Sequence, residues 1–117
     1  MIQQGQVWWT DLADPVGSEP GYRRPVVVVQ CDAFNASLIR TVVCVALTSN
    51  LKWADAPGNV ILATEETGLT KDSVANVSQI MTLDRDSLDE CVGRLARARL
   101  DAILRGIDMV LGRGFVR

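Results

Sequence analysis

The chain has 117 residues, of which 48% are hydrophobic and 22% charged, and its net charge is −2. This is the size of a single domain, residues 1–117, and the apolar content is too high for a disordered chain. The longest apolar runs have the length of strands, and the first residues lack the pattern of a signal peptide, so we expect a cytoplasmic protein without a membrane span. The negative charge argues against a nucleic-acid binder that works through bulk positive charge.

The complete absence of histidine restricts the chemistry further. It excludes Ser–His and Cys–His nucleophile pairs as well as zinc sites that use imidazole ligands. The cysteines, Cys31, Cys44 and Cys91, are odd in number and form no CxxC pair. We therefore expect free thiols in a reducing compartment, with Cys44 as a small core residue.

Strands are predicted along the first half of the chain at residues 6–12, 26–30 and 40–47. Trp8 and Trp9 are neighbours in the first strand, so they point to opposite faces and cannot both enter one core. The β-branched run of the second strand is typical of a strand that is covered on both faces.

The second half of the chain alternates short strands with turns and then changes period. Predicted strands cover residues 60–62, 73–77, 79–83 and 91–95, residues 48–53 form a polar loop, and helical turns cover residues 64–68 and 84–88. Near the end, apolar residues recur at steps of three and four, as in an amphipathic helix: Leu100, Ile103, Leu104, Ile107, Val110 and Leu111. This stripe is usually core packing, although part of it can form a dimer face.

These elements predict a mainly β protein of the α+β class. We expect a small, curled and largely antiparallel β-barrel of five to seven short strands, closed by the C-terminal helix.

Polar side chains cluster beside two of the predicted strands. Glu19, Tyr22, Arg23 and Arg24 precede the second strand, and Thr48, Ser49 and Asn50 follow the third. If these strands are antiparallel neighbours, Arg24 and Thr48 share one rim of the barrel. A guanidinium beside a hydroxyl resembles a phosphate clamp. The same residues also allow a surface salt bridge from Arg24 to Glu19 and a turn capped by Thr48, and composition and spacing do not decide between the two.

Ordered motifs along nearly the whole chain resemble those of MazF/PemK-type toxins. They are GxVxWxDL at 5–12, GSExGxxRPV at 17–26, Asn35, LTS at 47–49, GLxxDSV at 68–74 and QIxTLD at 79–84. The resemblance implies an SH3-like barrel that forms a homodimer, is neutralised by a cognate MazE-like antitoxin, and contacts DNA only indirectly through that antitoxin. It also implies an endoribonuclease that needs neither metal nor cofactor.

The family cuts single-stranded RNA by attack of a ribose 2′-hydroxyl on the adjacent phosphate, which leaves a 2′,3′-cyclic phosphate and a 5′-hydroxyl. The resemblance assigns the catalytic pair to Arg24 and Thr48. Because the nucleophile belongs to the RNA, no histidine is required. Arg24 suits stabilisation of the phosphorane, while Glu19 is either a base or a structural partner of Arg24.

Recognition of single-stranded RNA calls for stacking and for contacts to base edges. Candidate substrate-binding residues are Tyr22, Arg23, Ser49, Asn50, Trp53, Ser73 and Gln79. Trp53 can equally cover the end of the barrel. Met81 departs from the family, because many relatives carry a basic residue there, so RNA binding or sequence preference can differ in this chain.

Two other functions fit the same fold. One is a non-enzymatic, CcdB-like inhibitor of DNA gyrase, and the other is a degenerate member that only binds its antitoxin. The presence of both Arg24 and Thr48 favours the nuclease.

Overall fold

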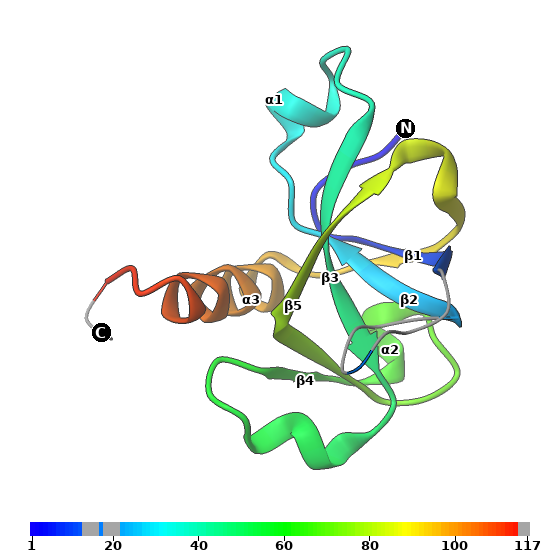
Figure 1. The fold of residues 1–117 in the computed structure, drawn as a ribbon. Helices are drawn as coiled ribbons and strands as arrows, with labels where there is room; N and C mark the ends of the chain where they lie inside the picture. The colour runs from blue at the N-terminus through cyan, green and yellow to red at the C-terminus, as the bar shows by residue number, and fades with distance from the viewer. Residues whose placement is uncertain (13–16, 18–21, 115–117) are drawn as a thin grey trace.

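A computed structural model describes residues 1–12, 17 and 22–114 of the chain (Figure 1). Its strands are β1 (Gln6–Leu12), β2 (Tyr22–Val28), β3 (Thr41–Thr48), β4 (Val60–Leu62), β5 (Ser73–Asp84) and β6 (Leu88–Arg94). Its α-helices are α1 (Asp32–Asn35), α2 (Thr64–Thr67) and α3 (Arg97–Val110), and short 3-10 helices, η1 (Leu51–Asp55) and η2 (Arg85–Ser87), lie between strands.

Within the described residues, the strands form one antiparallel sheet of six in the order β4-β5-β3-β2-β1-β6. The sheet curls strongly, and α3 packs beside β4 and β5 (Figure 1). The predicted curled antiparallel fold with a closing C-terminal helix is therefore confirmed.

Both faces of the sheet are covered, which explains the continuous apolar run in β2. Val27 packs into a core shared with Leu47 and Ile103, while its neighbours Val26 and Val28 pack into a second core on the other face. All three valines of β2 are fully buried, as expected for a strand in the middle of a covered sheet.

The tryptophans of β1 divide between these two cores. Trp9 packs against the core that contains Ile103, and Trp8 packs against the core that contains Cys44. Burial raises the pKa of the Cys44 thiol to about 12, so this group is an inert core residue at neutral pH. The predicted separation of the tryptophans and the core position of Cys44 are both confirmed.

The second strand begins at Tyr22, four residues before its predicted start, so Tyr22, Arg23 and Arg24, which we expected to precede the strand, belong to β2. The reason is pairing with β1, in which Thr10 lies opposite Arg24 and Trp9 lies opposite Pro25. Pairing with β3 begins only at Val26. Pro25 thus lies where one side of the strand is unpaired, which is a position in a sheet that tolerates proline.

The two strands predicted at residues 73–77 and 79–83 are one strand, β5. Val45 of β3 pairs with Ile80, but Leu47 pairs with Ala75, so β5 has extra residues between these pairs. The predicted break is a bulge at which the strand bends. The sixth strand starts at Leu88 rather than at residue 91, and part of the predicted polar loop forms η1.

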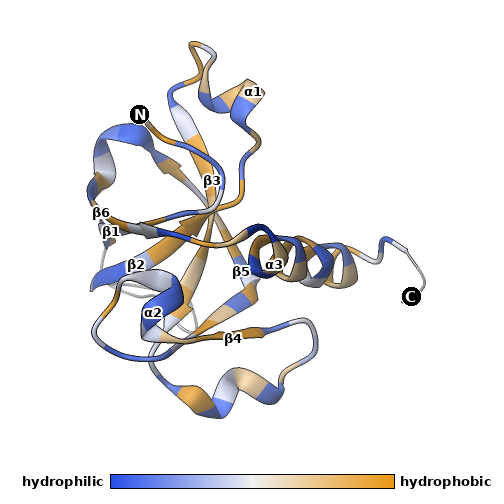
Figure 2. Ribbon diagram, turned by 180° about the vertical axis from the view of Figure 1, so that it is seen from behind, coloured by the Kyte–Doolittle hydropathy of each residue, from blue (hydrophilic) through white to orange (hydrophobic). Residues whose placement is uncertain are grey.

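Helix α3 presents one apolar side to the sheet, and Figure 2 shows it banded in hydrophobic and hydrophilic residues. Leu100 and Ile103 are buried, whereas Val110 and Leu111 at its end are exposed. A side chain at Gly106 would place its Cβ only 2.2 Å from the Gly58 carbonyl oxygen, so the helix touches this turn through bare backbone. No helix among the described residues is long and apolar enough to cross a membrane.

The motif residue Asn35 holds the connection between β2 and β3. Its amide Nδ2 donates to the Gln30 carbonyl at 2.9 Å, and its Oδ1 accepts from Gln30 Nε2 at 2.9 Å. The Arg85 guanidinium donates to the carbonyl oxygens of Asn35 and Ile39, both at 2.6 Å. These bonds satisfy buried polar groups and fix the end of α1.

Candidate active site

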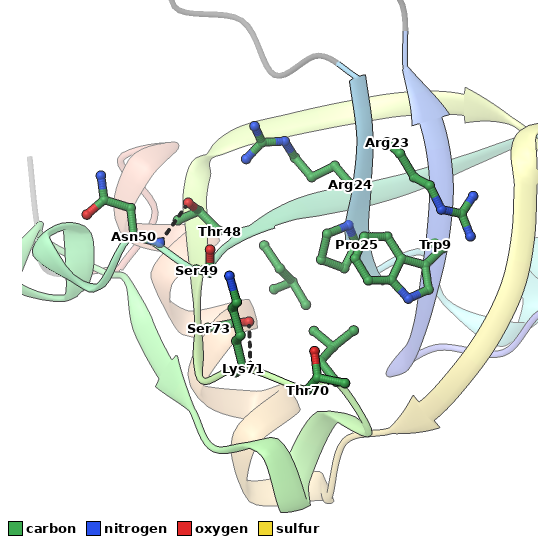
Figure 3. Close-up of a pocket in the computed structure, with 12 residues that line it drawn as sticks. Trp9, Arg23, Arg24, Pro25, Thr48, Ser49, Asn50, Thr70, Lys71 and Ser73 are labelled. Atoms are coloured by element: carbon green, nitrogen blue, oxygen red, sulfur yellow. Dashed lines mark hydrogen bonds between the residues drawn. The ribbon is translucent and has the colours of Figure 1, made fainter.

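A cleft of about 410 Å³ opens between β2, the end of β3 and the loop that joins α2 to β5 (Figure 3). Among the residues predicted for the site, those that line this cleft are Arg23, Arg24, Thr48, Ser49, Asn50 and Ser73. Residues that the sequence analysis did not assign to the site complete the lining: Trp9, Pro25, Leu47, Leu69, Thr70 and Lys71.

The register of the sheet explains why Arg24 and Thr48 lie at the same cleft. Val26 of β2 pairs with Ala46 of β3, and the strands are antiparallel. Continuing this register by two residues brings Arg24 level with Thr48. The predicted sharing of one rim is therefore observed, although Arg24 lies within the strand rather than before it.

Thr48 ends β3 and begins the turn that leads to η1. Its Oγ1 accepts a hydrogen bond from the backbone N–H of Asn50 at 3.1 Å, so it does cap a turn. A hydroxyl has one proton to donate and two lone pairs to accept. The capping bond therefore uses only a lone pair and positions the oxygen, and the hydroxyl proton remains available to a ligand.

Arg23 has a different environment from its neighbour. Its guanidinium forms ion pairs with Asp89 of β6 and, at 3.7 Å, with Asp11 of β1, and lies 5.2 Å from the centre of the Trp9 ring. The hydrogen bond to Asp89 raises the pKa of Arg23 above its ordinary value, and the charge stays on the guanidinium. Two carboxylates thus offset the charge of Arg23, and its stacked side chain forms a wall of the cleft with Trp9.

The other predicted site residues lie elsewhere. Glu19 falls outside the described residues. Three further residues are not among the described residues that line the cleft: Tyr22, Trp53 and Gln79. Tyr22 has 63% of its surface exposed, the Lys52 ammonium lies over the Trp53 ring on η1, and Gln79 lies at the bulge of β5. Trp53 leaves 46% of its surface exposed. The catalytic role of Glu19 and the roles of Tyr22, Trp53 and Gln79 in RNA binding stay predictions.

The residues that sequence reasoning missed had recognisable signals. Trp9 lies in the first motif and had to face away from Trp8. Thr70 and Lys71 occupy the two variable positions of GLxxDSV, close to Ser73, which the sequence analysis assigns to substrate binding. Met81, by contrast, packs against the second core and lies outside the described lining of the cleft.

The charge of the cleft is opposite to that of the whole chain. Basic side chains line it at Arg23, Arg24 and Lys71, and no carboxylate does so among the described residues. Hydroxyl and amide groups of Thr48, Ser49 and other residues supply neutral donors beside these cations. The arrangement suits an anion with several oxygen acceptors, such as a phosphodiester.

The fold and the cleft define a small curled β-barrel with a cation-lined cleft at the rim of its sheet. Residues 3–111 match the family described as the PemK-like, MazF-like toxin of type II toxin–antitoxin systems. The chain belongs to this family, which confirms the resemblance read from its motifs.

Known relatives match nearly the whole chain. Endoribonuclease MazF6 of Mycobacterium tuberculosis is 41% identical over 111 residues, covering 95% of this chain and 97% of the relative. Endoribonuclease MazF of Staphylococcus saprophyticus is 35% identical over 117 residues, covering all of this chain and 97% of the relative. Among solved structures, a mycobacterial endoribonuclease in complex with its cognate antitoxin superposes with a TM-score of 0.80 at 25% identity, over 98% of this chain and 99% of the other.

Proposed function

We propose that this protein is the endoribonuclease toxin of a type II toxin–antitoxin system and that it cuts single-stranded RNA. The relatives named endoribonucleases, which match almost end to end, support the activity. The observation that carries the proposal is the meeting of Arg24 and Thr48 at one cation-rich cleft without a described carboxylate in its lining.

In the proposed reaction, the ribose 2′-oxygen forms a bond to the adjacent phosphorus and the bond from phosphorus to the 5′-oxygen breaks. The proton of the 2′-hydroxyl goes to a base, and the departing 5′-oxygen gains a proton. The products are a 2′,3′-cyclic phosphate and a 5′-hydroxyl, so no water is consumed.

Arg24 and Thr48 act on the charge that develops in this step. The phosphorane carries more negative charge than the ground state, and donors that are already in place stabilise it most. Arg24 supplies a fixed positive charge, and the Thr48 hydroxyl donates to a non-bridging oxygen. Because a guanidinium is a poor base at neutral pH, Arg24 is assigned to charge stabilisation. Glu19 remains the candidate for the base or for a structural partner of Arg24.

The donor set supports a reaction without a protein-bound metal. Divalent metals that assist phosphoryl transfer are held by carboxylates, and transition metals also by imidazole or thiolate. The described lining of the cleft offers arginine, lysine, hydroxyl and amide groups instead.

The proposal includes partners. The solved mycobacterial relative is bound to its cognate antitoxin. We propose that a MazE-like antitoxin likewise neutralises this chain, that the chain forms a homodimer in the cytoplasm, and that it reaches DNA only through the antitoxin.

The test is cleavage of single-stranded RNA in EDTA by the wild type and by the Arg24→Ala and Thr48→Ala variants. Arg97→Ala, an exposed arginine paired with Asp101 on α3, is the matched control for lost positive charge. We expect the wild type and the control to cut, the two site variants to lose cutting, and the products to carry 5′-hydroxyl and 2′,3′-cyclic phosphate ends. Intact RNA with the wild type, or equal cutting by all four proteins, would refute the proposal.

A further inference from the structure

Lys71 brings a positive charge to the cleft from a different element than Arg24. Arg24 lies on β2, whereas Lys71 belongs to the loop between α2 and β5. In Figure 3 the Lys71 side chain extends from this loop toward Thr48 and Ser49, and Arg24 lies beyond them. The two cations therefore approach the end of β3 from different directions.

The start of this loop is anchored to the core. Gly68 ends α2 with a φ of 83°, a conformation that glycine adopts without strain. Leu69 is buried, with only 9% of its surface exposed, and its N–H donates to Thr67 Oγ1 at 3.0 Å. The chain is thus held in place two residues before Lys71.

The far side of the loop is anchored as well. The Asp72 carboxylate accepts from the Thr64 N–H at 3.1 Å, so it is turned toward the start of α2. Ser73 Oγ donates to the Lys71 carbonyl at 3.3 Å. The backbone that carries Lys71 is therefore preorganised, and the neighbouring acid is engaged away from the cleft.

The Lys71 ammonium also differs from the Arg23 guanidinium in the carboxylates that lie beside it. Two carboxylates face Arg23, whereas Lys71 forms no ion pair within the described part of the chain. An ammonium is a compact point charge with three donors, which suits the oxygens of a single phosphate.

We propose that Lys71 binds the phosphate next to the scissile one, so that the cleft holds two consecutive phosphates of the RNA. The scissile phosphate lies between Arg24 and Thr48, which the strand register brings level, and its neighbour lies at Lys71 beyond Ser49. This assignment rests on the proposed function. It makes Lys71 a substrate-binding residue that sets the path of the strand and leaves the chemical step to Arg24 and Thr48.

The test uses an RNA that the wild type cuts, together with a version that carries 2′-deoxyribose at the nucleotide supplying the nucleophile. The affinity of the uncut version is measured between about 50 and 200 mM salt for the wild type and for Lys71→Met, Lys71→Arg and Lys52→Met. Lys52 is the other lysine of the chain, and it lies outside the described lining of the cleft, so its variant loses the same charge at a different place.

We expect Lys71→Met to bind roughly ten-fold more weakly at low salt, because it loses a charged contact. The slope of log affinity against log salt is negative, and in Lys71→Met it should become shallower by about 0.7, the value for one phosphate of a single strand. Lys71→Arg and Lys52→Met should keep the wild-type slope. The cleavage rate of Lys71→Met with saturating enzyme should fall less than its affinity, because the contact is made mainly in binding and the chemical step is left to Arg24 and Thr48.

An unchanged slope in Lys71→Met, an equal loss in Lys52→Met, or a loss of the saturated rate larger than the loss of affinity would overturn this inference alone, because the RNA is still cut. A wild type that cuts no RNA would overturn the proposed function, and this inference with it.

Discussion

Replacing Thr48 by valine separates the observed capping bond of its hydroxyl from the proposed donation to a phosphate oxygen. Valine keeps the shape and the β-branch at the end of β3, but it can neither accept from the Asn50 N–H nor donate to a phosphate oxygen. Asn50 is exposed, so water can take the place of the lost capping bond. We therefore expect the free energy of unfolding to fall by no more than about 1 kcal/mol.

The cleavage rate should respond far more strongly. Loss of one preorganised donor to the transition state costs about 10²–10³ in rate, or about 3–4 kcal/mol. Single-turnover cleavage with excess enzyme measures this loss, and urea unfolding measures the stability of the same samples. Thr48→Ser keeps the hydroxyl and should stay close to the wild-type rate. Wild-type cleavage by Thr48→Val, or an equal loss in serine and valine variants, would show that the hydroxyl takes no part in the reaction.

Further predictions concern the frame that carries the site. Gly106→Ala should lower the free energy of unfolding by about 1–3 kcal/mol despite the helix preference of alanine, since its Cβ would lie 2.2 Å from the Gly58 carbonyl oxygen; urea unfolding measures this. Hydrogen bonds from the Ala63 N–H and from Arg99 lower the pKa of Glu66 in the folded protein. Its contribution to the free energy of unfolding is therefore present above the pKa of the unfolded state and is lost as the pH falls through the pKa of the folded state. Glu66→Gln should therefore show a weaker loss of melting temperature on acidification below about pH 4 than the wild type. Arg85→Ala leaves the carbonyl oxygen of Asn35 without its 2.6 Å donor and should lower the melting temperature.

Local pattern was sufficient for most of the fold, because periodicity and turn residues act over a few neighbours. The stripe of α3, the short strand β4 and the turn that ends at Gly68 all follow from such signals. The start of β2 did not. Its polar residues and Pro25 favour a loop, and pairing with β1 makes them a strand. Similarly, the polar break in β5 is a bulge that only its unequal pairing with β3 reveals.

The candidate site was predictable where strand order determines it. Antiparallel neighbours place the start of one strand beside the end of the next, which brought Arg24 and Thr48 together. Trp9 and Lys71 were missed although both lie in motifs recognised in the sequence, because those motifs do not show where the side chains lie in the fold. They reach the cleft from β1 and from the loop after α2, and no local spacing in the sequence relates these elements to β2 or β3.

An acidic chain can bind a polyanion when its charges are sorted in space. The total charge of −2 sets only the weak long-range field, which salt screens within about 10 Å. At the cleft, Asp11 and Asp89 are occupied by Arg23, and Asp72 is held at the start of α2. Among the described residues, these three acids are thus engaged by other groups, while Arg24 and Lys71 line the cleft. When the cations of a protein are gathered at one cleft, affinity for an anion comes from a few close contacts. The net charge of the chain is then a poor guide to its ligand.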